Sequence, residues 1–205
     1  PGPGGRPSAA DAVADFQSGL GSGSGGLPAP SAWAAGLSPA RQREWLVDCY
    51  RMRVDDEYAW GGGELRGLYA QATGGGGSVA FDFLLFCKLA AKHGVVPEGW
   101  DWAAFLATAK GLLRYAFEKS DAQEKYGQEN VFAVATGGRS LRYTGEVVYG
   151  SSIMSMQRSE AEERMESRVG GGRFHDEFFG EVGGAAVWRQ AGLAPEPRGD
   201  EGKGG

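Results

Sequence analysis

Residues 78–93 form an almost uninterrupted apolar run, and this run constrains the fold more than any other stretch of the chain. A helix here would be apolar on nearly every side, and such helices lie buried among other elements. Its apolar side chains are Val79, Phe81, Phe83, Leu84, Leu85, Phe86, Cys87 and Leu89. We therefore expect an all-α fold, an irregular bundle of about four to six helices around this central helix.

Two further helices are predicted with clear starting points. Ser38 followed by Pro39 is a typical helix start, and apolar residues then recur at helical spacing, so a helix is expected over residues 39–56. Asp101 is a good N-cap for the next helix, and apolar side chains follow the i, i+3, i+4, i+7 pattern from Trp102 to Phe117.

Weaker patterns predict three more helices. Residues 121–135, with an interruption at Gly127, and the highly charged residues 153–169 are expected to be helical. Residues 139–149 fit the two-residue period of a strand and the period of a helix almost equally well. A strand would need a partner strand, and no other segment offers one, so we favour a helix there.

The two ends of the chain differ in composition from the block between them. Glycine makes up 36 of 205 residues and is concentrated in short runs, which are typical of linkers and turns. We expect a disordered Gly/Pro/Ser-rich linker at 1–37, a helical domain at 38–150, and a charged helix with a Gly-rich tail at 151–205. An apolar cluster from Phe174 to Trp188 is expected either to dock on the domain or to bind a partner.

Charge and composition exclude several classes of function. The chain carries 21 Lys and Arg against 26 Asp and Glu, a net charge of −5, without the basic stripe that nucleic-acid binding needs. No run of about 18 apolar residues predicts a transmembrane helix. Two cysteines are too few for the disulfide framework of a small secreted domain, so an intracellular location is expected. No cofactor-binding signature is recognisable, and we expect no cofactor.

Aromatic and apolar side chains are unusually dense in residues 57–77, a segment that we interpret as a loop. They are Tyr58, Trp60, Leu65, Leu68 and Tyr69. Such side chains either fill a core or form the centre of a protein-binding surface, where Trp and Tyr contribute most of the binding energy. Trp60, next to three glycines, is the residue that we most expect to be exposed. These five residues are the predicted partner-binding site.

Carboxylates and histidines suggest an alternative, a site for a divalent metal ion. The candidate ligands are Asp55, Asp56, His93, His175 and Asp176. Carboxylates and imidazoles are common metal ligands, but adjacent residues of a helix point about 100° apart and do not readily converge on one ion. The simpler interpretation of Asp55 and Asp56 is an acidic helix end that faces water, with Arg51 and Arg53 as ion-pair partners.

Several short segments within residues 41–151, about half of the chain, have distinctive sequences. They are residues 45–53, Asp55-Asp56, 60–63, 83–88, 115–121, Tyr126-Gly127, 129–132 and 138–142. Together they resemble a helical region that accompanies MYND-type zinc fingers in proteins of microbial eukaryotes. The finger itself needs a cluster of Cys and His ligands, which the two Cys and two His of this chain do not supply. The resemblance therefore implies a fragment of a larger adaptor protein, of a kind sometimes linked to ubiquitin ligases, and carries over no zinc ligand.

Two functional hypotheses follow from the sequence. The first is a non-enzymatic module that binds a protein partner through the aromatic residues of segment 57–69, since no catalytic constellation is recognisable. The second is a small metal-dependent hydrolase that uses the carboxylate and histidine ligands named above. A stoichiometric bound metal would favour the second hypothesis, and a partner lost on substitution of Trp60 would favour the first.

Overall fold

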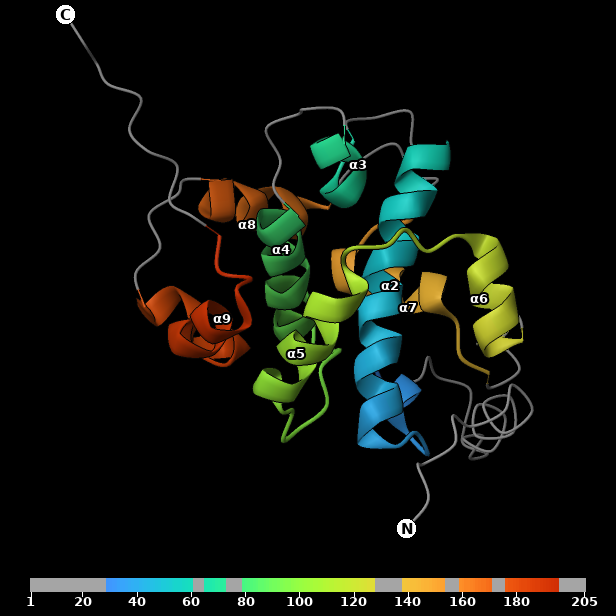
Figure 1. The fold of residues 1–205 in the computed structure, drawn as a ribbon, viewed down its shortest axis with the longest axis horizontal. Helices are drawn as coiled ribbons and strands as arrows, with labels where there is room; N and C mark the ends of the chain where they lie inside the picture. The colour runs from blue at the N-terminus through green and yellow to red at the C-terminus, as the bar shows by residue number, and fades with distance from the viewer. Residues whose placement is uncertain are drawn as a thin grey trace, which may run out of the picture.

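The structure is a computed structural model and describes residues 29–60, 65–72, 79–127, 138–153, 159–170 and 176–195. These residues form helices joined by short connections, with no strand among them, so the predicted all-α fold is confirmed for this part of the chain. None of the described helices combines the length and the apolar composition that crossing a membrane requires. The elements in chain order (Figure 1), with η for a 3-10 helix, are η1 (Ala32–Ala34), α2 (Pro39–Trp60), α3 (Gly67–Ala72), α4 (Val79–Lys92), α5 (Trp102–Leu112), α6 (Lys119–Tyr126), α7 (Leu141–Tyr149), α8 (Glu160–Gly170), η3 (Asp176–Val182) and α9 (Ala185–Ala191).

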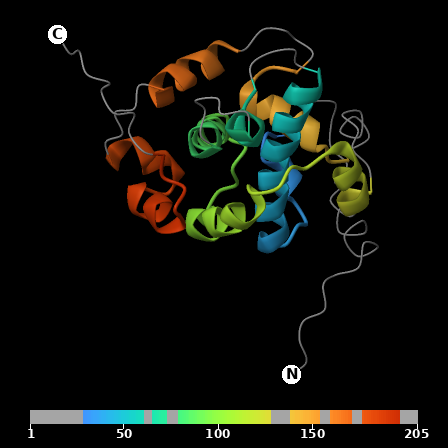
Figure 2. The ribbon, with the colours of Figure 1, turned by 45° about the horizontal axis from the view of Figure 1, so that its top comes forward.

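Helix α4 carries the apolar run, and other elements pack on it from several directions. It contacts α3, α7, α8 and η3, and it lies near the middle of the ribbon in Figure 2. Residues 83–90 of this helix are all buried. One of them, Lys88, is charged, and its Nζ donates to the Phe178 carbonyl at 2.5 Å and lies 3.2 Å from the Glu181 carboxylate. A buried ammonium group needs such partners because leaving water would otherwise be very unfavourable.

Helix α2 packs against both α5 and α7 and supplies much of the remaining core. The Tyr50 ring of α2 lies against Phe83 and Phe86 of α4, with ring centroids 5.0 and 5.4 Å apart. Residues 139–149, for which strand and helix were both considered, contain helix α7, as favoured. The Ser140 side chain caps this helix by accepting a hydrogen bond from the Tyr143 backbone amide at 3.1 Å.

One predicted helix ends earlier than expected. Helix α5 begins after Asp101, which caps it as predicted, but it ends at Leu112, and Phe117 reaches the core from the connection that follows. Helix α6 begins at Lys119, and the left-handed residue Gly127, with φ of 80°, ends it at the position where an interruption was predicted. Residues 128–137 lie outside the described part of the chain.

Segments beyond the predicted domain limits of 38 and 150 also contribute to the core. The Trp33 side chain is 6% exposed, and its Nε1 donates to the Val95 carbonyl at 2.9 Å. Met165 of α8 and Trp188 of α9 are buried in the same core cluster. The C-terminal apolar cluster therefore docks on the domain, as one of the two expectations had it, while Phe174 lies outside the described residues.

Candidate functional site

The predicted partner-binding residues lie on α2, on α3 and between them. Tyr58 and Trp60 belong to the last turn of α2, Leu68 and Tyr69 belong to α3, and Leu65 precedes α3. The interpretation of segment 57–77 as a loop is therefore wrong for residues 57–60 and 67–72, which are helical. Helices hold side chains more firmly than loops do, so the aromatic rings are presented in fixed positions.

Ion pairs explain why α2 continues through its acidic run to Trp60. Carboxylates near the C-terminal end of a helix are unfavourable, because the helix dipole is negative there. Here the Arg142 guanidinium binds both oxygens of Asp56 at 2.7 Å. The Arg53 Nε atom binds Glu57, one turn later in the same helix, at 2.6 Å. Because Asp56 and Glu57 are both paired, the helix continues beyond residue 56, where it was predicted to end.

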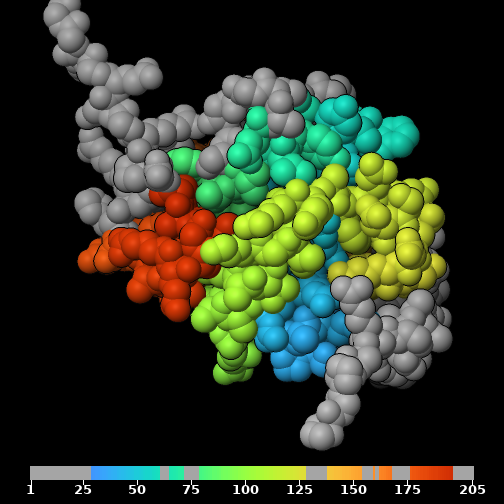
Figure 3. Space-filling model, viewed as in Figure 1, coloured from blue at the N-terminus to red at the C-terminus, as the bar shows by residue number. Residues whose placement is uncertain are grey.

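Large apolar side chains are exposed at this end of the molecule. Trp60 is 71% exposed, Tyr58 is 58% exposed and Leu65 is 37% exposed. Tyr115, in the connection after α5, is 67% exposed, and Figure 3 shows that connection meeting the end of α2 and α3. Single exposed apolar residues are ordinary on protein surfaces, but a contiguous group of them marks a binding site. We call Tyr58, Trp60, Leu65, Leu68, Tyr69 and Tyr115 the aromatic surface.

A stacked pair of tyrosines forms the centre of the aromatic surface. The rings of Tyr58 and Tyr69 are 4.4 Å apart between centroids and nearly parallel, at 4°. The Tyr69 hydroxyl donates to Asp55 Oδ1 at 2.7 Å. Burial, this hydrogen bond and the charges of Asp55 and Glu118 all raise the pKa of Tyr69, so the ring is a neutral phenol at physiological pH.

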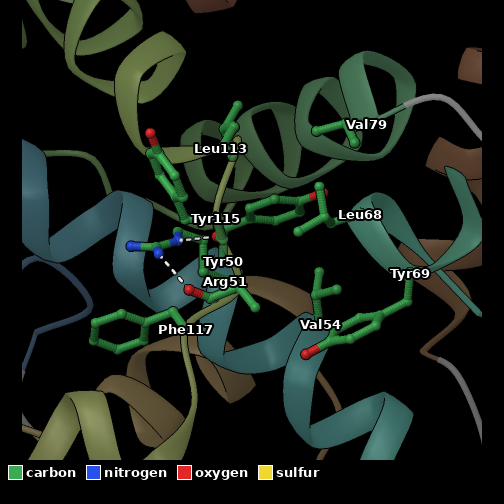
Figure 4. Close-up of a pocket in the computed structure, with 10 residues that line it drawn as sticks. Tyr50, Arg51, Val54, Leu68, Tyr69, Val79, Leu113, Tyr115 and Phe117 are labelled. Carbon is green, nitrogen blue, oxygen red and sulfur yellow. Dashed lines mark hydrogen bonds between the residues drawn. The ribbon is translucent and has the colours of Figure 1, made fainter. Parts of the chain in front are cut away.

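A shallow groove separates Tyr69 from Tyr115 (Figure 4). Its cavity volume is about 20 Å³. Sites for small-molecule substrates usually enclose hundreds of Å³, so this groove suits one side chain of a larger partner. The lining residues are Tyr50, Arg51, Val54, Leu68, Tyr69, Val79, Leu113, Tyr115, Ala116 and Phe117.

Arg51 builds one wall of the groove. Its guanidinium donates to the carbonyls of Tyr115 and Ala116 at 3.0 and 2.7 Å, and to Asp48 at 2.7 Å (Figure 4 draws the two carbonyl contacts). The same group lies 4.7 Å from the centre of the Phe117 ring. Sequence analysis expected Arg51 to pair with the acidic end of α2, whereas it holds the connection after α5 in place.

The structure gives most of the candidate metal ligands other partners. Asp55 binds the Tyr69 hydroxyl, Asp56 binds Arg142, and Asp176 binds Arg189. The His93 ring Nδ1 lies 2.7 Å from the Val148 carbonyl. Among the described residues, no group of three or more His, Cys, Asp and Glu side chains is placed to hold a metal ion. His175 lies outside the described residues, so its part of the prediction stays untested.

A buried set of charged groups lies below the aromatic surface, and sequence analysis did not single it out. Arg66, which is 9% exposed, lies 2.7 Å from Glu162 of α8, 3.3 Å from Glu57 of α2 and 3.9 Å from Asp82 of α4. The Tyr50 hydroxyl donates to Asp82 at 2.8 Å. Arg66 directly precedes α3, so these contacts fix the helix that carries Leu68 and Tyr69.

The cysteines offer no nucleophile. Cys49 and Cys87 are not in a disulfide, and both are buried. Burial raises the pKa of the Cys87 thiol, as expected for a cysteine within an apolar helix, and a protonated thiol is a poor nucleophile.

Comparisons with known proteins identify no relative for this arrangement. No protein-family model, no curated protein and no solved structure matches the chain.

Proposed function

We propose that this chain is a non-enzymatic interaction module, in which a helical bundle built around α4 presents the aromatic surface to a protein partner. The observation that supports it most is the exposure of Tyr58, Trp60 and Tyr115, each by more than half. Tyr115 lines the groove, and Tyr58 and Trp60 belong to helix α2, which borders it. Tyrosine and tryptophan contribute large contact areas with little conformational freedom to lose, which is why they dominate protein-binding sites.

The local architecture supports a preformed surface. Stacking on Tyr58 and the hydrogen bond to Asp55 hold the Tyr69 ring, and Arg51 holds the backbone beside Tyr115. A partner that binds here would therefore not have to order these groups, which would otherwise reduce its affinity.

The resemblance to the helical region of MYND-type proteins stays a prediction and is compatible with this role. In that case the chain is part of a larger adaptor whose finger lies elsewhere, and its location inside the cell is part of the same proposal. A metal-dependent hydrolase has less support, because four of its five candidate ligands have other partners in the described part of the chain.

Partner capture with the full chain tests the proposal. The wild type, a Tyr58→Ala/Tyr115→Ala variant and a Tyr143→Ala control are immobilised and incubated with native lysate, and bound proteins are identified by mass spectrometry. Tyr143 is a half-buried tyrosine of α7 that does not line the groove, so the control matches the chemistry of the change.

We expect a partner that binds the wild type and the control and is lost from the double variant, with all three proteins showing the same helical circular dichroism. A partner retained by the double variant would show that binding uses another surface. The absence of any specific partner would contradict the module itself.

A further inference from the structure

We propose that the groove between Tyr69 and Tyr115 receives a basic side chain, a lysine or an arginine, from an extended peptide segment of the partner. This inference rests on the proposed function and specifies the chemistry of what binds. It is supported by the aromatic rings of the groove, by the carboxylates near them, and by the existing hydrogen bonds of Arg51, the basic residue among the lining side chains.

The groove combines aromatic rings with apolar side chains. Figure 4 shows Tyr115 on one side of the groove and Tyr69 on the other, with Tyr50 between them and Val54, Leu68 and Val79 on the Tyr69 side. The long aliphatic stem of a lysine or arginine packs well on such side chains while its charged end stays near water. The ring faces attract a cation through their negative quadrupole.

Three carboxylates lie at the groove or close in sequence to a residue that lines it. Asp55 lies 2.7 Å from the Tyr69 hydroxyl, and the exposed Glu118 directly follows the lining residue Phe117. Asp121 accepts a hydrogen bond from the Glu118 amide at 2.8 Å, so its charge lies at the same place. Burial, the hydrogen bond to Asp55 and the charges of Asp55 and Glu118 raise the pKa of the Tyr69 phenol, so both charges act on a side chain that lines the groove.

The neighbouring arginines already bind other groups. Arg51, the basic residue among the groove's lining side chains, is engaged by two carbonyls and by Asp48, which it shares with Lys125. Arg142, which acts electrostatically on Asp55, is bound to both oxygens of Asp56. A cation from a partner would therefore meet carboxylates beside arginines that already have partners.

The same charges disfavour other occupants. A phosphate group or an acidic peptide would be repelled by Asp55, Glu118 and Asp121. A purely apolar side chain would fit the groove but would gain nothing from the carboxylates. The net charge of −5 on the whole chain also favours approach of a basic partner.

Selection from a random-peptide library displayed on phage tests the inference with the full chain as bait. The peptides that survive are synthesised with a fluorophore, and their dissociation constants are measured by fluorescence polarisation at low and high salt. Three variants are compared with the wild type: Asp55→Asn/Glu118→Gln, Tyr58→Ala/Tyr115→Ala, and a Glu98→Gln control. Glu98 is an exposed residue that precedes α5, whereas Tyr115 follows it, so the control changes charge at the opposite end of that helix.

We expect enriched peptides with a lysine or arginine beside an apolar residue. Replacing that basic residue with Gln, or using the Asp55→Asn/Glu118→Gln variant, should weaken binding by about fivefold to tenfold, and added salt should reduce the difference. The Glu98→Gln variant should bind like the wild type, and the Tyr58→Ala/Tyr115→Ala variant should not bind.

Other outcomes separate the two proposals. Peptides that need Tyr58 and Tyr115 but lack basic residues, or that bind equally to the charge variant, would overturn the inference and leave the proposed function standing. Peptides that bind independently of Tyr58 and Tyr115, or no enriched peptide at all, would overturn both.

Discussion

The contribution of Asp82 to the stability of this protein should fall as the pH rises from 4.5 to 7. This residue lies in the first turn of α4, and its side chain is only 12% exposed. Burial raises its pKa from 3.8 to about 6, and the charges of Glu57 and Glu166 act in the same direction. Arg66 and the Tyr50 hydroxyl lower it, but Arg66 lies 3.9 Å away and is closer to two other carboxylates.

The sign and size of the effect follow from proton linkage. Between pH 4 and pH 6 the folded state holds a proton on Asp82 that the unfolded chain has released, so raising the pH favours unfolding. With pKa values of about 6 in the folded state and 3.8 for the model side chain, the free energy of unfolding contributed by Asp82 decreases by about 2 kcal/mol from pH 4.5 to pH 7. Above pH 7 the contribution of this group is nearly constant.

The substitution that isolates this effect is Asp82→Asn. Asparagine has nearly the same shape, its carbonyl oxygen can still accept the Tyr50 hydrogen bond, and it does not titrate. Urea unfolding of both proteins, followed by circular dichroism at pH 4.5, 5.5 and 7, gives the two free energies of unfolding at each pH. Comparing the two proteins at each pH cancels the titration of all other groups to first approximation.

Between pH 4.5 and pH 7, we expect the free energy of unfolding of the variant to increase by about 2 kcal/mol relative to that of the wild type. Glu98→Gln, which removes a carboxylate at an exposed position, should show no such change. If the difference between Asp82→Asn and the wild type were the same at pH 4.5 and at pH 7, the carboxylate would not be buried in the way described, and the reasoning would be refuted.

Four other changes test the packing. Gly111 is exposed in α5 and an added Cβ would meet nothing within 4 Å, so Gly111→Ala should raise the free energy of unfolding by about 1 kcal/mol; an unchanged urea midpoint would argue against a helix there. Gly183 has φ of 90°, and an added Cβ would lie 2.4 Å from the Trp102 Cβ. Gly183→Ala should therefore lower the free energy of unfolding by about 2 kcal/mol or more, which a lower melting temperature would show. Trp188→Ala should lower the free energy of unfolding by about 3–5 kcal/mol. A fragment of residues 38–150 omits this side chain and should therefore lack a cooperative thermal transition. A sharp transition of the fragment would contradict the core described above.

Apolar spacing predicted the helices whose packing depends on one apolar face or on complete burial. The run at 78–93, the stripe after Asp101 and the helix at 139–149 all correspond to helices of the structure. Apolar spacing predicted the ends of helices poorly where polar contacts determine them. Nothing in the stripe from Trp102 to Phe117 shows that an arginine of another helix binds the carbonyls of Tyr115 and Ala116.

The candidate site was predicted in part for a similar reason. Dense aromatic residues in segment 57–69 pointed to Tyr58 and Trp60, which the structure shows to be exposed. Tyr115 was missed, although its position off the apolar stripe of its segment was a usable signal of exposure. Arg66 could not have been found, because its three carboxylate partners come from α2, α4 and α8 and are far from it in sequence.

Helix α2 shows why the fold and the candidate site depend on the same polar contacts. Its buried residues include Asp48, Arg53 and Asp56, so it lacks a clean division into an apolar and a polar face. Asp48, fully buried, accepts hydrogen bonds from Arg51, Lys125 and the Tyr126 hydroxyl at 2.7 Å each. One carboxylate therefore links the arginine that builds the groove wall to the helix that begins just after Glu118. Because a buried charge is stable only when its partners are in place, these contacts define the arrangement of α2 and α6 more narrowly than apolar packing alone would.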